Sequence, residues 1–174
     1  MAKSSPALWC LLGVLALGSP TIAEAVSSDP NNPTIMKMVT YPKLDKKALG
    51  QLVKSAENGD ASAQQELASR HLLGQSVPQD FKLFEKWMRK AAESGHYPAQ
   101  RALADVYWGL GFTGIVPLDH VESYKWRLLS LEIIPKEEKG KAMVPLTFYE
   151  QQLTSAQLTD AKRRADLVRA GYKK

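Results

Sequence analysis

The sequence is almost free of cysteine. Its 174 residues include one, Cys10, which lies in an apolar stretch near the N-terminus. A chain without a pair of cysteines forms no internal disulfide bond. The residues after Cys10 contain neither a thiol nucleophile nor a thiolate metal ligand. The sequence also lacks the HExxH zinc motif, the GxSxG nucleophile elbow and the phosphate-binding loop. These absences exclude the enzyme classes that depend on those motifs.

Histidine is scarce as well. The chain has three histidines, and none has a second ligand at a spacing that favours metal binding: His71, His96 and His120. Glu93 and His96 are three residues apart, but Gly95 interrupts the helix between them. We therefore expect structural or surface roles for the histidines, and no metal site, cofactor or catalytic residue.

Residues 1–25 have the pattern of a secretory signal peptide. Lys3 gives a basic start, residues 7–17 form an apolar stretch too short to span a bilayer comfortably, and residues 23–25 (AEA) supply a small-x-small cleavage pattern. We expect cleavage after Ala25, which leaves a cysteine-free mature chain in the periplasm or outside the cell. The alternative is an uncleaved membrane anchor.

The positive charge of the chain lies at its C-terminal end. Residues 161–174 carry six basic side chains and one acidic one, whereas residues 26–160 carry sixteen of each sign. Such an end can meet an acidic partner, an anionic membrane surface or a polyanion. It is also typical of a solvated helix end, because cations near a helix C-terminus interact favourably with its dipole. The sequence favours the helix end and leaves surface binding open.

The middle of the chain repeats itself. The pattern Ala-Glu-x-Gly-x-x-x-Ala-Gln-x-x-Leu begins at Ala56 and again at Ala92, an offset of 36 residues. The pattern Val-Pro-x-Asp begins at Val77 and again at Val116, an offset of 39, and the glycine-rich residues 109–114 account for the three inserted positions. Periods of this length are typical of helix–loop–helix units, which stack into a solenoid because no unit buries its apolar face alone.

Each repeated residue has a physical role. Gly59, with its counterpart 36 residues later, stands where a helix ends in a left-handed residue. Asp80, with its counterpart 39 residues later, stands where an N-cap accepts the free amides of the next helix. Trp87 follows seven residues after Asp80, and we expect it and its counterpart to bury a large apolar area between units.

These elements together resemble Sel-1-like repeats, which are relatives of tetratricopeptide repeats. The matching units are residues 56–91 and 92–131, and residues 44–58 form an incomplete leading unit, so that the resemblance covers residues 44–131. It implies an all-α fold, an α/α solenoid of helix-turn-helix repeats with flanking capping helices. The sequence departs from the family at Phe84 and Ser123, where the family usually has alanine.

The flanking segments are predicted from local patterns. Residues 26–43 contain three prolines and no helical period, so we expect a flexible or extended lead-in. Within residues 132–174, residues 141–152 are a helix candidate, and Thr154 with Gln157 has capping-box spacing before a helix that runs to Arg169. We expect these helices to cap the solenoid with a basic end, and we expect six or seven helices and no sheet.

The resemblance also implies a binding surface. In tetratricopeptide-like solenoids the first helix of each unit lines a concave face, and the core positions leave the residues between them free to face a partner. Trp108 has a second interpretation as core packed against residues 109–114, whereas an aromatic residue beside an arginine is typical of a binding hot spot. The candidate partner-binding residues are Gln65, Ser69 and Leu72 in the first unit and Arg101, Asp105 and Trp108 in the second.

We therefore predict an exported helical scaffold that binds another protein or peptide segment through its concave groove and catalyses no reaction. One alternative is an envelope enzyme or penicillin-interacting protein, since some cysteine-rich exported proteins of this repeat family have been linked to penicillin binding. This chain lacks their cysteine pairs. The other alternative is a polyanion or membrane-surface binder acting through residues 161–174. No nucleic-acid-binding module is recognisable in the sequence.

Overall fold

The computed structural model describes residues 41–110, 114–136 and 145–172. The expected leader and most of the lead-in lie outside these residues, as do residues 141–144 of the candidate C-terminal helix. The described residues form seven helices and no strand, which confirms the all-helical prediction. The helices are α2 (Lys46–Glu57), α3 (Ala61–Leu73), α4 (Phe81–Glu93), α5 (Tyr97–Trp108), α6 (His120–Glu132), α7 (Leu146–Glu150) and α8 (Ser155–Gly171).

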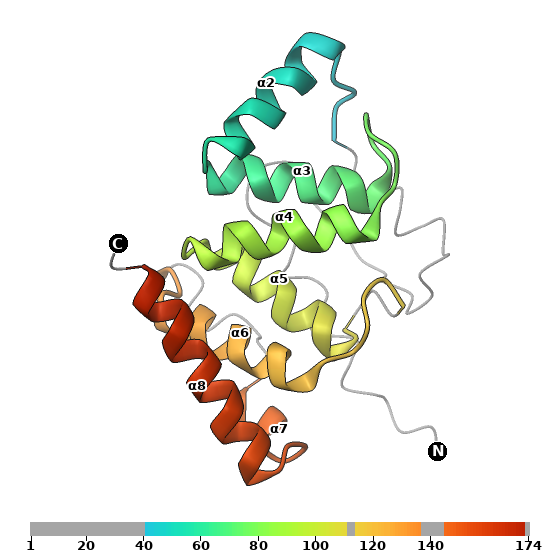
Figure 1. Cartoon of the computed structure of the whole chain (residues 1–174). Coiled ribbons are helices and arrows are strands. Elements are labelled where there is room, and N and C mark those ends of the chain that lie inside the picture. The colour runs from blue at the N-terminus through green and yellow to red at the C-terminus, as the bar shows by residue number, and fades with distance from the viewer. Residues whose placement is uncertain (1–40, 111–113, 137–144, 173–174) are drawn as a thin grey trace.

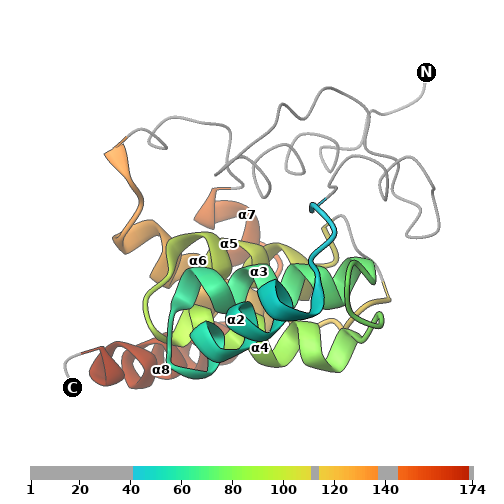
Figure 2. The same cartoon turned by 90° about the horizontal axis from the view of Figure 1, so that it is seen from above.

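The helices stack in chain order. Each of α2 to α5 packs against the next helix, and α6 packs against α8 and the short α7, so that Figure 1 shows a ladder from α2 to α8. Seen from above, α7 and α8 lie on opposite sides of the stack (Figure 2). We call α3 and α4 the first unit and α5 and α6 the second unit. None of the helices in the described residues is long and apolar enough to cross a membrane.

The repeated Gly-x-x-x-Ala-Gln pattern turns the chain from one unit into the next. Gly59 and Gly95 have φ angles of 94° and 85°, a region that favours glycine. The side-chain amide of Gln64 donates to the Ala56 carbonyl oxygen at 2.9 Å, which satisfies one of the last acceptors of α2. Gln100 does the same for the end of α4, donating to the carbonyl oxygen of Ala92 at 3.0 Å. The glutamine of the motif therefore fastens each first helix to the preceding helix end.

The predicted N-caps are confirmed. Asp80 Oδ1 accepts from the amides of Lys82 and Leu83 at the start of α4. Asp119 Oδ1 accepts from the amide of Glu122 at 2.9 Å at the start of α6. These bonds fix where the second helix of each unit begins.

The core lies between the helices and uses the repeated positions. Leu67 and Leu103 are 2% and 0% exposed, and Trp87 and Trp126 are 8% and 0% exposed. Ser123, which departs from the family pattern, is fully buried and donates from its hydroxyl to the Ala104 carbonyl oxygen at 2.5 Å, so its polar group has a partner. The repeat pattern thus predicted these core positions correctly.

The C-terminal segment differs from the prediction in one helix. The candidate helix over residues 141–152 is shorter within the described residues, since α7 covers only Leu146–Glu150 and begins after Pro145 as its N-cap. Proline lacks an amide donor and fixes its own φ, which suits it to a helix start. The capping box of Thr154 and Gln157 is confirmed, and α8 continues beyond the predicted end to Gly171.

Candidate functional site

Three of the candidate residues lie on α3. Gln65 and Leu72 are partly exposed, and Leu72 also packs against the core cluster. Ser69 is 8% exposed, and its hydroxyl donates to the Gln65 carbonyl oxygen at 3.0 Å within the helix. In the first unit, Gln65 and Leu72 are therefore partly accessible at the surface, while Ser69 is largely enclosed.

The other three candidates lie on α5, where two of them are buried. Arg101 and Asp105 are 7% and 3% exposed. Asp105 Oδ1 accepts from Arg127 Nη2 of α6 at 2.6 Å, so this carboxylate is used inside the fold. Burial raises the pKa of the Asp105 carboxyl above its ordinary value, against the opposing effect of Arg127 and Arg101. Trp108 remains partly exposed.

Trp108 belongs to an aromatic cluster at the end of the second unit. Its ring stacks on that of His120, with centroids 4.2 Å apart, and meets the edge of Tyr149 at 4.6 Å and Phe148 at 5.4 Å. One of the two interpretations of Trp108 places it against residues 109–114, of which residues 111–113 lie outside the described residues. Trp108 is thus partly core, through α6 and α7, and partly surface.

A buried polar chain links the same three helices. Arg127 donates to the Tyr149 hydroxyl oxygen from Nη2 at 3.1 Å and from Nε at 3.2 Å, in addition to its bond with Asp105. Arg127 is 1% and Tyr149 0% exposed. Because a buried charge needs a partner, α7 is held against the second unit by this chain of bonds as well as by its aromatic rings.

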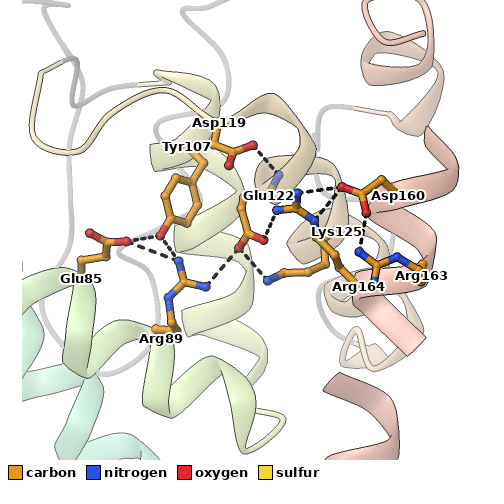
Figure 3. Close-up of polar contacts among 9 residues, drawn as sticks. All are labelled: Glu85, Arg89, Tyr107, Asp119, Glu122, Lys125, Asp160, Arg163 and Arg164. Carbon is orange, nitrogen blue, oxygen red and sulfur yellow. Dashed lines mark hydrogen bonds and ion pairs between the residues drawn. The ribbon is translucent and has the colours of Figure 1, made fainter. Parts of the chain in front are cut away.

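A second polar network joins the second helices of the units to α8 (Figure 3). Glu122 lies at its centre, where its two carboxylate oxygens accept from Lys125 at 2.6 Å and from Arg89 and Arg164 at 3.0 Å each. These donors come from α6, α4 and α8 in turn. Glu122 therefore links α4, α6 and α8 through its carboxylate.

The network continues outward at both ends. On α4, Arg89 Nη2 donates to the Tyr107 hydroxyl oxygen at 2.5 Å, and that hydroxyl donates to Glu85. On α8, Asp160 accepts from Arg163 and Arg164. Sequence patterns did not predict this network, because its members are 18 to 42 residues apart where they join different helices. One signal was available: at the position of Glu122 the first unit has an apolar residue, 39 positions earlier.

The basic C-terminal helix is largely neutralised by acidic side chains. Arg163 pairs with Asp160, Arg164 with both Asp160 and Glu122, and Arg169 with Asp166 and with Glu132 at the end of α6. Hydrogen bonds from Arg164 and Arg163 hold the pKa of the Asp160 carboxyl below its ordinary value. Arg164 and Arg169 thus contribute to packing α8 on α6, and these ion pairs reduce the field available to an anionic surface.

The described residues show no metal centre: no group of three or more His, Cys, Asp or Glu side chains among them could hold an ion. The glycines of residues 109–114 have the spacing of a dinucleotide-binding loop. Gly109, however, ends the helix α5 rather than a strand, so that the structural context of such a loop is missing. The described residues therefore give no positive sign of catalysis.

Comparison with known proteins places the fold. No protein-family model and no curated protein matches the chain. Among solved structures, the chain is similar to a protective antigen present in uropathogenic Escherichia coli strains, whose crystal structure displays a Sel1-like repeat (SLR) fold. The two are 29% identical with a TM-score of 0.59, over 82% of this chain and 29% of that protein. The chain thus spans less than a third of the length of the antigen it matches.

The fold comparison and the sequence pattern agree. The stacked helix pairs, the repeated glutamine and glycine turns, and the SLR-fold neighbour all lead to the same architecture. This chain is an all-helical α/α solenoid with the Sel1-like repeat fold.

Proposed function

We propose that this chain is an exported scaffold that binds a segment of another protein along the first helices of its units, without catalysing a reaction. The observation that carries this proposal is a repeated, partly exposed apolar position. Leu72 of α3 and Trp108 of α5 are 36 residues apart, at equivalent places of the two units, and neither is fully buried. A solenoid that presents one such position in each unit suits a partner that extends along the stack.

The proposed surface is narrower than the six candidate residues. Asp105 is engaged by Arg127, and Arg101 and Ser69 are nearly enclosed, so these three serve mainly to shape the helices. Gln65, Leu72 and Trp108 remain as the contact positions. Large aromatic side chains are enriched at protein interfaces, so Trp108 is the main anchor of the proposed surface.

Export is a part of the proposal that depends on residues 1–25 alone. Its test is fractionation of cells that express the full chain, followed by N-terminal sequencing of the protein in the periplasmic and external fractions. We expect a mature protein that begins at Val26. A full-length protein that stays in the cytoplasm would remove export from the proposal while leaving the binding surface untouched.

The binding surface is tested with a matched pair of variants. Gln65→Arg places a long cation on the proposed surface, whereas Gln51→Arg makes the same change on an exposed position of α2. Residues 26–174 of each form, and of the unchanged protein, serve as bait for capture from an envelope extract, after circular dichroism has shown equal helix content. We expect a partner that the unchanged protein and Gln51→Arg retain and that Gln65→Arg loses. Equal retention by all three would contradict the proposed surface.

A further inference from the structure

The end of the lead-in lies against the first unit of the solenoid. Residues 41–44 precede α2 and pass beside the loop between α3 and α4 (Figure 1). The amide of Tyr41 donates to Gln75 Oε1 at 2.7 Å, and the amide of Leu44 donates to Ser76 Oγ at 2.9 Å. The first unit thus already holds a non-helical segment of the chain, which consists of the end of the lead-in and the residue that follows it.

The contacts bind main chain at three points. Besides the two amides, the Pro42 carbonyl oxygen accepts from Arg70 Nη1 at 3.1 Å. Bonds to amides and carbonyls do not depend on the side chains of the bound segment. The one side chain held specifically is that of Tyr41, whose ring centroid lies 5.0 Å from the Arg70 guanidinium.

The receptor side of this contact is held in place independently of the lead-in. Arg70 Nε and Nη2 both donate to Glu66 Oε1, at 2.9 and 2.8 Å, which fixes the guanidinium on α3. Ser76 has a φ of 66° and is the one non-glycine residue with positive φ in the described part of the chain. A conformation of that kind costs free energy for a residue with a side chain, and here it directs the hydroxyl to the amide of Leu44.

The contact is particular to the first unit. The offset of 36 residues places Val106 of the second unit at the position of Arg70, and valine can neither donate to a carbonyl nor cover a ring as a cation. The end of the second unit is instead packed by α7, through Tyr149 against Trp108. The first unit therefore has a polar site, formed by Arg70, Gln75 and Ser76, which we call the cradle. The second unit has an aromatic contact at its corresponding end.

We propose that Arg70, Gln75 and Ser76 form a binding site for a non-helical segment that begins with an aromatic residue, and that Tyr41–Leu44 occupies this site as an internal competitor. A partner segment of the same chemistry then binds by displacing the lead-in. This deepens the proposed function and rests on it for its biological role, although the site itself can be tested without any natural partner. The lead-in competes at the high effective concentration of a tethered segment, so it weakens binding of a free peptide.

The experiment measures binding of a fluorescent synthetic peptide with the sequence of residues 38–47 to the mature full chain. Tyr41→Ala in the protein weakens the internal competitor and leaves the cradle intact. We expect this variant to bind the peptide about tenfold more tightly than the unchanged protein, by fluorescence anisotropy. In the Tyr41→Ala background, Gln75→Ala and Ser76→Ala each remove one acceptor and reduce the affinity, whereas Gln75→Glu keeps an oxygen acceptor and retains it.

The outcomes separate this proposal from the proposed function. No saturable peptide binding by the Tyr41→Ala protein, or binding that Gln75→Ala and Ser76→Ala leave unchanged, would overturn the site. Gln75 and Ser76 lie in a loop outside the helices, and circular dichroism verifies that each variant is folded. Failure to capture a partner from an extract would count against the proposed function, but it would not alter the peptide measurement.

Discussion

The two units share one repeat pattern but differ in how much of each is enclosed. In the second unit, ten of the 12 residues of α5 and eight of the 13 residues of α6 are buried. In the first unit the numbers are seven of 13 for α3 and five of 13 for α4. The second unit is covered by the first unit on one side and by α7 and α8 on the other. Among the described residues, the outer side of the first unit is covered by α2 and the short segment before it.

This difference in burial changes what charged residues do. Arg70 in the first unit and Arg127 in the second are both 1% exposed, yet the side chain of Glu66, which pairs with Arg70, is 38% exposed. The side chain of Asp105, which pairs with Arg127, is 4% exposed. A carboxylate at the surface keeps much of its hydration without its partner, but one in the interior does not. Position in the stack, more than the repeat sequence, therefore decides how strongly a polar pair contributes to stability.

The largest expected effects on stability come from the two tryptophans. Trp126→Ala should lower the free energy of unfolding by about 3 to 5 kcal/mol, because it empties a fully buried site. Trp87→Ala should cost roughly 1 kcal/mol less, since that residue is 8% exposed whereas Trp126 is fully buried. Urea denaturation followed by circular dichroism measures both changes. Equal costs would show that burial within the stack does not distinguish the two units.

Substitutions of the two buried arginines should have the next largest effects on the free energy of unfolding. Arg127→Met leaves Asp105 without this donor in the interior and should cost roughly 3 kcal/mol. Arg70→Met leaves Glu66 at the surface, where water replaces the guanidinium, and should cost about 1 kcal/mol. The double variant Arg127→Met with Asp105→Leu removes both charges of the pair. It should recover part of the stability that Arg127→Met loses. If the double variant is no more stable than Arg127→Met, then the unpaired carboxylate is not the cause.

The smallest expected effect concerns the pH dependence of the network around Glu122. Burial acts to raise the pKa of this carboxyl, but hydrogen bonds and charges from Lys125, Arg164 and Arg89 outweigh it and hold the pKa below the ordinary value of 4.5. Because the pKa is lower in the folded state than in the unfolded state, the stabilisation is complete above the ordinary pKa. It is lost as pH falls through the folded-state pKa.

Glu122→Gln removes this charge and should therefore cost about 1 to 2 kcal/mol at pH 7 and much less at about pH 3. Urea midpoints of the variant and the unchanged protein at the two pH values give the comparison. The first unit has Leu83 at the equivalent position, so the effect belongs to the second unit alone. A difference that stays constant between the two pH values would contradict a role for the ionised carboxylate.

Most of the architecture could be predicted from the sequence because its signals are local. Gly59 and Gly95 lie within two residues of the helix ends that they follow, and Asp80 and Asp119 each bond an amide two or three residues away. Contacts at such short separations are determined by residue type and spacing. The candidate surface was predicted less completely, because helical spacing gives the face on which Asp105 lies but not the presence of Arg127, 22 residues later, against it.

The repeated pattern and the local backbone chemistry of the sequence are enough to give the order of the units, the N-caps of α4 and α6, and the buried positions of Leu67, Leu103 and Trp126. Which charged residues of different helices meet depends on the tertiary structure. Glu122 lies at the centre of its network, and the lead-in contacts Arg70, through bonds between residues that are 28 to 42 positions apart in the chain. The physical reason is that such contacts depend on how the helices stack, and burial then sets the strength of each polar pair.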